Sequence, residues 1–111
     1  MEVFSTYMLD RFETRMVRHL RETFPDRTEK VSNDKLRDVV KAGMQKAEHY
    51  GIEFEDDVRR FLEYLVIYGA RLDSKPSTRW LGAILRRQDI DGTHKMDLID
   101  AAELQALREP P

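Results

Sequence analysis

The chain has 111 residues, of which 41% are apolar and 36% charged, and its 19 basic and 21 acidic side chains give a net charge of −2. This length suits a single domain, and so small a net charge excludes the basic field that non-specific nucleic-acid binding needs. The absence of cysteine excludes disulfides, thiolate metal ligands and thiol nucleophiles. The N-terminal residues mix acids and arginines with apolar side chains, and no apolar run approaches the roughly 18 residues of a membrane span. We therefore expect one soluble, cytoplasmic domain over residues 1–111, with frayed ends at 1–4 and 109–111.

The first predicted helix runs from about Ser5 to Phe24, because apolar side chains recur there every four residues. These side chains are Met8, Phe12, Met16, Leu20 and Phe24. Pro25 biases the residue before it away from helical geometry and so ends the helix. Residues 26–31 are predicted to be a short polar connection.

A second helix follows, capped by the side-chain oxygen of Ser32 or Asn33 and ending at Gly51, which suits a left-handed C-cap. Its apolar positions, at helical spacing, are Leu36, Val39, Val40, Met44, Ala47 and Tyr50. Gly43 lies inside this helix, where glycine costs about 1 kcal/mol relative to alanine. A close approach of another helix at Gly43 is the expected compensation.

The third helix begins after the acids of residues 53–57, which favour the positive end of a helix dipole, and closes at Gly69. Apolar residues occupy most of its circumference, leaving only Arg59, Arg60 and Glu63 facing outward. They are Val58, Phe61, Leu62, Leu65, Val66 and Tyr68. A helix that is apolar nearly all round is a buried one, so we expect this helix to be central.

Two shorter segments complete the fold after a loop at residues 70–76. Ser77 or Thr78 is predicted to cap a fourth helix, and an Asp-Gly turn at residues 91–92 precedes a fifth helix capped by Thr93. The inward positions are Trp80, Leu81, Ile84 and Leu85 in the fourth helix, and Met96, Ile99, Ala102 and Leu107 in the fifth. The predicted fold is therefore an all-α, compact and mostly antiparallel five-helix bundle with the third helix central.

No residue pattern indicates catalysis or metal binding. The three histidines are scattered over separate helices, and the DIDGT segment from Asp89 places its glycine fourth rather than sixth, unlike a calcium loop. The acids at residues 53–57 are explained by the helix dipole. We therefore expect no enzymatic activity, no cofactor and no bound metal.

Two groups of side chains are candidates for binding. Aromatic residues at core spacing are expected to be buried by default, yet Tyr64 and Tyr68 lie one turn apart and form a partner-binding patch with Trp80 if that edge is open. The aromatic group is Phe54, Phe61, Tyr64, Tyr68 and Trp80. The segment from Ser74 to Lys95 holds five basic and two acidic residues, including Arg79 and Arg86, and a helix-turn-helix regulator would place such a segment on DNA.

An ordered series of motifs carries a family resemblance. It comprises HLRETFP from His19 to Pro25, AEHYGI from Ala47 to Ile52, Glu55, Asp57-Val58, Arg60-Phe61, Tyr68-Gly69, Asp73, Pro76, Trp80, Leu85 and Lys95-Met96-Asp97. With this series the chain resembles, from about Phe12 to Asp97, small helical proteins of Gram-negative bacteria encoded beside type VI secretion spike, PAAR-tip, adaptor and toxin genes. Leu72, often aromatic in similar sequences, and the basic stretch Lys75–Arg79 depart from the pattern.

The resemblance implies an accessory role and brings no catalytic residues with it. We expect a protein partner, namely a secreted effector or its adaptor, which the chain would bind as a chaperone or loading co-factor. An immunity protein that neutralises a cognate toxin is the alternative within binding proteins. A small DNA-binding regulator is the alternative of another class.

Overall fold

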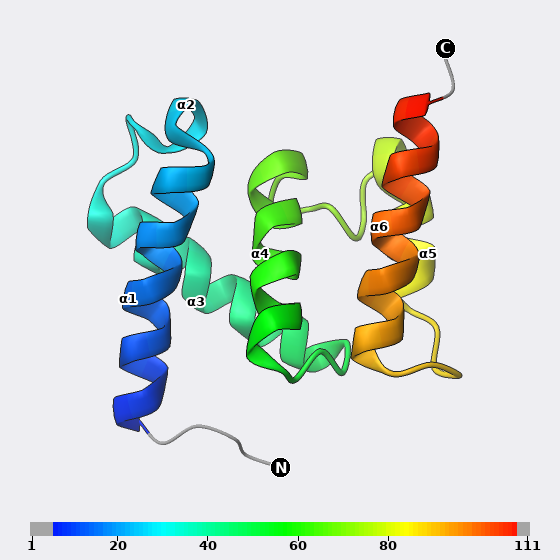
Figure 1. Cartoon of the computed structure of the whole chain (residues 1–111), viewed down its shortest axis with the longest axis horizontal. Coiled ribbons are helices and arrows are strands. Elements are labelled where there is room, and N and C mark those ends of the chain that lie inside the picture. The colour runs from blue at the N-terminus through cyan, green and yellow to red at the C-terminus, as the bar shows by residue number, and fades with distance from the viewer. Residues whose placement is uncertain (1–5, 109–111) are drawn as a thin grey trace.

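A computed structural model describes residues 6–108 of the chain, and the side chains of residues 8–107. Regular structure in this part is entirely helical, which confirms the all-α class, but a one-turn helix brings the number of α-helices to six rather than five. The predicted frayed ends, residues 1–4 and 109–111, lie outside the described residues. The elements labelled in Figure 1 are α1 (Thr6–Thr23), α2 (Pro25–Thr28), α3 (Asn33–His49), α4 (Glu55–Tyr68), a 3-10 turn η1 (Pro76–Thr78), α5 (Arg79–Leu85) and α6 (Gly92–Arg108).

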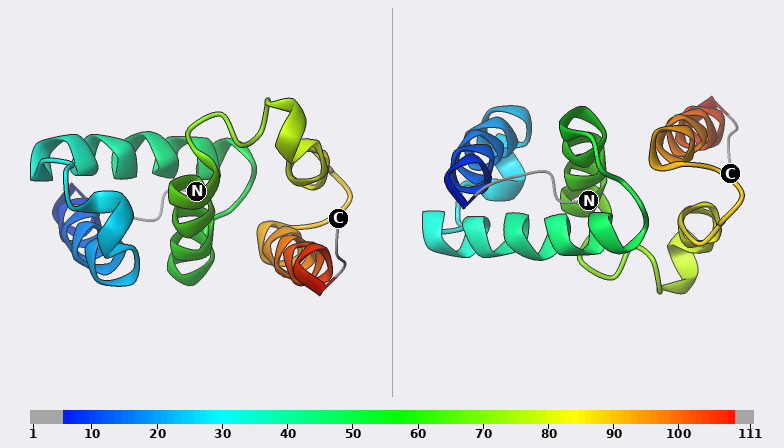
Figure 2. Two further views of the ribbon diagram at one scale, coloured as in Figure 1. Left: turned by 90° about the horizontal axis from the view of Figure 1, so that it is seen from above. Right: turned by 90° about the horizontal axis from the view of Figure 1, so that it is seen from below.

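The helices form two layers in a compact body measuring 41 × 35 × 20 Å. Figure 1 shows α1, α4 and α6 side by side, and Figure 2 shows α3 and α5 on one side of that row. The three helices of the row run in the same direction (Figure 1), so the expected mostly antiparallel arrangement is wrong. The reason is that α3 crosses the row and returns the chain to the end at which α1 begins. α4 then starts from that same end.

Most predicted helix ends are confirmed. α1 ends at Thr23, one residue short of the predicted Phe24 and two before Pro25. The Ser32 hydroxyl oxygen accepts a hydrogen bond from the Lys35 backbone N–H at 3.1 Å at the start of α3. Gly51 and Gly69 follow α3 and α4 with φ of 78° and 97°, values that strain residues with a Cβ. The predicted polar connection after α1 is in part the extra helix α2.

One predicted cap is wrong, and another is right in position but makes no capping hydrogen bond. The N-terminal cap of α6 is Asp91, whose Oδ1 accepts from the His94 backbone N–H at 2.8 Å, while Thr93 lies inside the helix and donates its hydroxyl to Asp57. Thr78 is the N-cap residue of α5, as predicted, but its hydroxyl donates to the Leu72 carbonyl at 2.6 Å and makes no capping bond to the helix. In both cases a threonine at a plausible cap position bonds to a more distant group.

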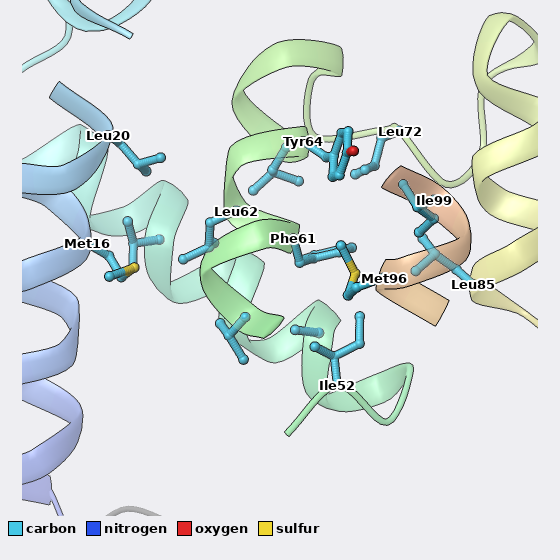
Figure 3. Packing of buried hydrophobic residues seen from close by; sticks show 14 of the residues in the cluster. Met16, Leu20, Ile52, Phe61, Leu62, Tyr64, Leu72, Leu85, Met96 and Ile99 are labelled. Carbon is cyan, nitrogen blue, oxygen red and sulfur yellow. The ribbon is translucent and has the colours of Figure 1, made fainter. Parts of the chain in front are cut away.

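The core is one cluster to which every long helix contributes, and part of it is drawn in Figure 3. Phe61 of α4 is fully buried and lies beside Met96 of α6 in that view. The buried apolar residues are Phe12, Met16, Leu20, Leu36, Val40, Ala47, Ile52, Val58, Phe61, Leu62, Tyr64, Leu65, Leu72, Leu81, Leu85, Met96 and Ile99. α4 packs against α1, α3 and α6.

Gly43 is where α3 crosses α4. A Cβ added there would lie 2.5 Å from Leu62 Cδ2 and 2.9 Å from Leu65 Cδ2, so the predicted close approach is confirmed. Three predicted core positions are wrong: Leu107 is 77% exposed, Phe54 is 69% exposed and Met8 is 47% exposed.

Candidate functional site

The three aromatic residues proposed as a binding patch are neighbours in the structure. The rings of Tyr64 and Tyr68 stack on α4 with centroids 6.2 Å apart, and Trp80 of α5 meets Tyr68 edge-on at 6.1 Å and 86°. Tyr64 is buried, with 7% of its surface exposed, whereas Tyr68 and Trp80 are half-buried. The surface that a partner can reach is therefore formed by Tyr68 and Trp80, with Tyr64 behind them.

Carboxylates of α6 hold both tyrosines in place. The Tyr64 hydroxyl donates to Asp100 Oδ1 at 2.6 Å, and the Tyr68 hydroxyl donates to Glu103 Oε2 at 3.0 Å. Burial, followed by these carboxylates, raises the pKa of each tyrosine above its ordinary value. Both phenols stay protonated near neutral pH and act as hydrogen-bond donors, which does not suit them as bases or nucleophiles.

The two acids, Asp100 and Glu103, were missed by sequence reasoning. They belong to the contact between α4 and α6, which run in parallel. Residues that pair across this contact are separated by a nearly constant number of positions in the sequence. Arg60 Nη1 donates to Asp97 Oδ1 at 3.0 Å in the same contact. The sequence did contain a signal for these pairs, because the acids of α6 and the polar residues of α4 recur at similar helical spacing. That signal can be interpreted only when the two helices are known to be neighbours.

Arg79 and Arg86, the two basic candidates, differ in their surroundings. Arg79 is exposed and has no hydrogen-bond partner within residues 6–108, so its charge is available beside Trp80. Arg86 Nη1 donates to the Asp73 carbonyl at 2.8 Å.

The other three cations of the basic segment are also bonded within the chain. Lys75 donates to the Tyr68 carbonyl, Arg87 pairs with Asp89 at 2.6 Å, and buried Lys95 donates to the Tyr50 carbonyl at 2.7 Å. Burial lowers the pKa of Lys95.

A polar cluster centred on Asp73 joins the α4–α5 loop to α3. Lys46 Nζ lies 2.8 Å from Asp73 Oδ1, and the Tyr50 hydroxyl donates to Oδ2 at 2.6 Å. Burial and the bond to Asp73 raise the pKa of Tyr50 to about 12. Burial alone would raise the pKa of Asp73, but hydrogen bonds from Lys46 and Tyr50 lower it below its ordinary value. Because the tyrosine proton is held by the carboxylate, the cluster anchors the loop and offers no free base.

The histidines and acids are dispersed over the molecule. His19 Nε2 lies 2.6 Å from Glu63 Oε2 between α1 and α4, and the His49 ring meets Tyr50 edge-on. Asp89 and Asp91, the candidates for a calcium loop, instead pair with Arg87 and cap α6. Within residues 6–108, no group of three or more His, Asp or Glu side chains is arranged to hold a metal ion.

A shallow groove of about 620 Å³ lies between α1 and the beginning of α3. Arginines from both helices dominate its polar lining, and Val17 supplies apolar surface. The lining residues are Thr14, Val17, Arg18, Arg21, Glu22, Asn33, Asp34 and Arg37. Sequence reasoning did not find this groove, because its residues come from two helices whose crossing is a tertiary property.

Comparison of the chain with protein families, with curated proteins and with solved structures gave no match. None of the helices between residues 6 and 108 combines the length and apolar character that crossing a membrane requires.

Proposed function

We propose that the chain is a non-enzymatic, protein-binding accessory factor, acting in the cytoplasm as a chaperone or loading co-factor for a type VI secretion effector or its adaptor. The observation that supports protein binding is the half-buried Tyr68–Trp80 pair with the unpaired Arg79 beside it. Tyrosine, tryptophan and arginine are the residue types enriched at interaction hot spots. The secretion context rests on the family resemblance alone.

Preorganisation favours this surface as a binding site. Tyr68 is stacked on Tyr64 and hydrogen-bonded to Glu103, so little side-chain freedom remains to be lost when a partner binds. We also infer that α4 is the central helix of the bundle, because it packs against α1, α3 and α6. A central helix would hold the aromatic pair on the most rigid element of the fold.

The DNA-binding alternative is less well supported. Of the five cations between Ser74 and Lys95, four donate to groups of the chain itself, and Arg79 has no hydrogen-bond partner among the residues that the structure describes. The seven-residue α5 is also short for a recognition helix. A regulator of this kind would need a cluster of phosphate contacts and would bind DNA in a strongly salt-dependent manner.

A pulldown from the native host tests the proposal. Tagged wild-type protein is expected to retain a spike, adaptor or toxin protein encoded nearby, and Trp80→Ala and Arg79→Glu are expected to lose it. Arg27→Glu is the matched control, because Arg27 is an exposed arginine on α2, away from the aromatic pair. Retention of the partner by both aromatic-face variants, or loss in the control as well, would contradict the proposed surface.

Co-expression with the retained toxin then separates the two roles within binding proteins. A loading factor is expected to increase toxin delivery without protecting the cell that makes it. An immunity protein is expected to protect that cell. Recovery of DNA in place of protein would replace the proposal with the regulator.

A further inference from the structure

Phe54 is unfavourable for folding in two independent ways. Its side chain is 69% exposed, and it occupies the N-cap of α4 without making a capping hydrogen bond. Serine, threonine, aspartate or asparagine at an N-cap typically stabilises a helix by about 1 kcal/mol relative to an apolar residue. A residue that breaks local rules without gaining packing is a candidate for function.

The neighbours of Phe54 make an acidic–aromatic projection, which we define as residues 53–56. Glu55 is paired with Arg15 at 3.1 Å, and Asp56 with Arg59 at 2.8 Å. Glu53 is exposed and has no partner in the described part of the chain. A surface that receives the projection should therefore offer apolar area next to positive charge.

The α1–α3 groove has these properties. Arg18 is exposed and unpaired within residues 6–108. Arg21 donates to the Thr28 and Val31 carbonyls at 2.8 and 2.6 Å and to Asn33 Oδ1 at 3.0 and 2.8 Å. All three acceptors are neutral, so Arg21 is fixed in position while no bonded carboxylate neutralises its charge.

The remaining charges decide which part of the groove can receive an acid. Arg37 is already paired with Glu13 at 3.0 Å and with Asp10 at 3.5 Å. Glu22 and Asp34 also line the groove and repel a carboxylate brought near them. The favourable position is therefore at Arg18 and Arg21, next to the apolar surface of Val17.

We propose that the acidic–aromatic projection of one copy of this chain docks in the α1–α3 groove of a second copy. Phe54 packs on Val17, and Glu53 faces Arg18. Within one molecule the projection contacts α1 through the Glu55–Arg15 pair, while Phe54 stays 69% exposed and Glu53 has no partner among the described residues, so the projection does not fill the groove of its own chain. The contact joins unlike surfaces and therefore builds a ring or an open chain of copies.

Analytical ultracentrifugation of the purified full chain, over a protein concentration series at low and high salt, tests this association. The average mass is expected to rise with concentration and to rise less at high salt, which screens the charge pair. Phe54→Ala should lower the association constant about tenfold or more, because burial of the ring is lost. Leu107→Ala is the control, since Leu107 is also an exposed apolar residue, at 77%, and is expected to associate like the wild type.

Charge exchange adds a test of orientation. Arg18→Glu alone is expected to weaken association, and Glu53→Lys combined with Arg18→Glu is expected to restore it. Phe54→Ser separates docking from folding, because it should abolish association while the new cap raises the thermal midpoint. A monomer at every concentration, a wild-type association constant in Phe54→Ala, equal loss in Leu107→Ala, or no recovery in the charge exchange would overturn the proposal.

This inference and the proposed function fail independently. Self-association is measured on purified protein and depends on residues 53–56 and the groove, whereas the pulldown depends on the face formed by Tyr68, Arg79 and Trp80. A negative result in one experiment leaves the other unchanged.

Discussion

Replacing Gly92 with alanine tests the docking of α6 on the rest of the molecule. A Cβ at Gly92 would clash with the Gly51 carbonyl oxygen and lie 2.7 Å from the Ile52 Cα, and both of these are backbone atoms. Because backbone cannot rotate away, the start of α6 must shift. That shift would strain the Thr93–Asp57 and Lys95–Tyr50 hydrogen bonds.

The magnitude follows from two opposing terms. Overpacking typically costs about 1–3 kcal/mol, and alanine recovers at most about 1 kcal/mol of helix propensity at the first turn. Because the clash is with backbone atoms, we expect the upper end of that cost, about 3 kcal/mol, and so a net loss of about 2 kcal/mol in the free energy of unfolding, or roughly 8 °C in Tm for a domain of this size.

Urea denaturation followed by far-UV circular dichroism measures this loss, with an unchanged m-value showing that the unfolded state is unaffected. Gly43→Ala is the matched control. Its Cβ meets the Cδ2 atoms of Leu62 and Leu65, and side chains can shift more easily than backbone, so its loss should be smaller. A Gly92→Ala variant as stable as the wild type, or less perturbed than Gly43→Ala, would refute the packing of α6 against the Gly51–Ile52 backbone.

Three further predictions concern the core and the polar clusters. Phe61→Ala, at a fully buried position, should cost about 3–5 kcal/mol in a denaturant melt; a loss below about 1 kcal/mol would show that the ring is not in the core. Tyr64→Phe removes a hydrogen bond to a carboxylate and should cost about 1.5–3 kcal/mol, whereas unchanged stability would mean that the Tyr64–Asp100 bond does not stabilise the fold. Tyr50 should titrate near pH 12 in an ultraviolet absorbance titration. Because its folded-state pKa is raised, unfolded chains release this proton first, and stability should fall between about pH 10 and pH 12. A Tyr50→Phe variant with the same alkaline loss would contradict that assignment.

Local signals in the sequence determined the class of the fold and most helix boundaries. The 3.6-residue apolar spacing marked the long helices, and Pro25, Ser32, Gly51 and Gly69 mark ends that the structure confirms. These signals work because a cap, a proline or a left-handed glycine acts on backbone groups within a few residues of itself. Gly43 also indicated a helix crossing, because glycine inside a helix lowers its stability and close packing against another helix explains why it is there.

Contacts between distant residues decided the rest. Periodicity cannot distinguish a parallel from an antiparallel neighbour, so the shared direction of α1, α4 and α6 and the contact between Tyr64 and Asp100 came only from the tertiary structure. Leu107 shows the same limit. Tyr68, the last residue of α4, pairs with Glu103, so the final turn of α6 extends past its neighbour and an apolar side chain of correct spacing has nothing to pack against.

For the candidate binding surfaces too, some features could be predicted from the sequence and others only from the tertiary structure. The sequence by itself identified Tyr68, Trp80 and Arg79, because aromatic and basic side chains are visible one residue at a time. Only the tertiary structure decided that Tyr64 is buried behind them, that four neighbouring cations are already bonded, and that Phe54 is exposed. Burial and charge neutralisation depend on which groups the fold brings within a few ångströms, and a spacing along one helix does not contain that information.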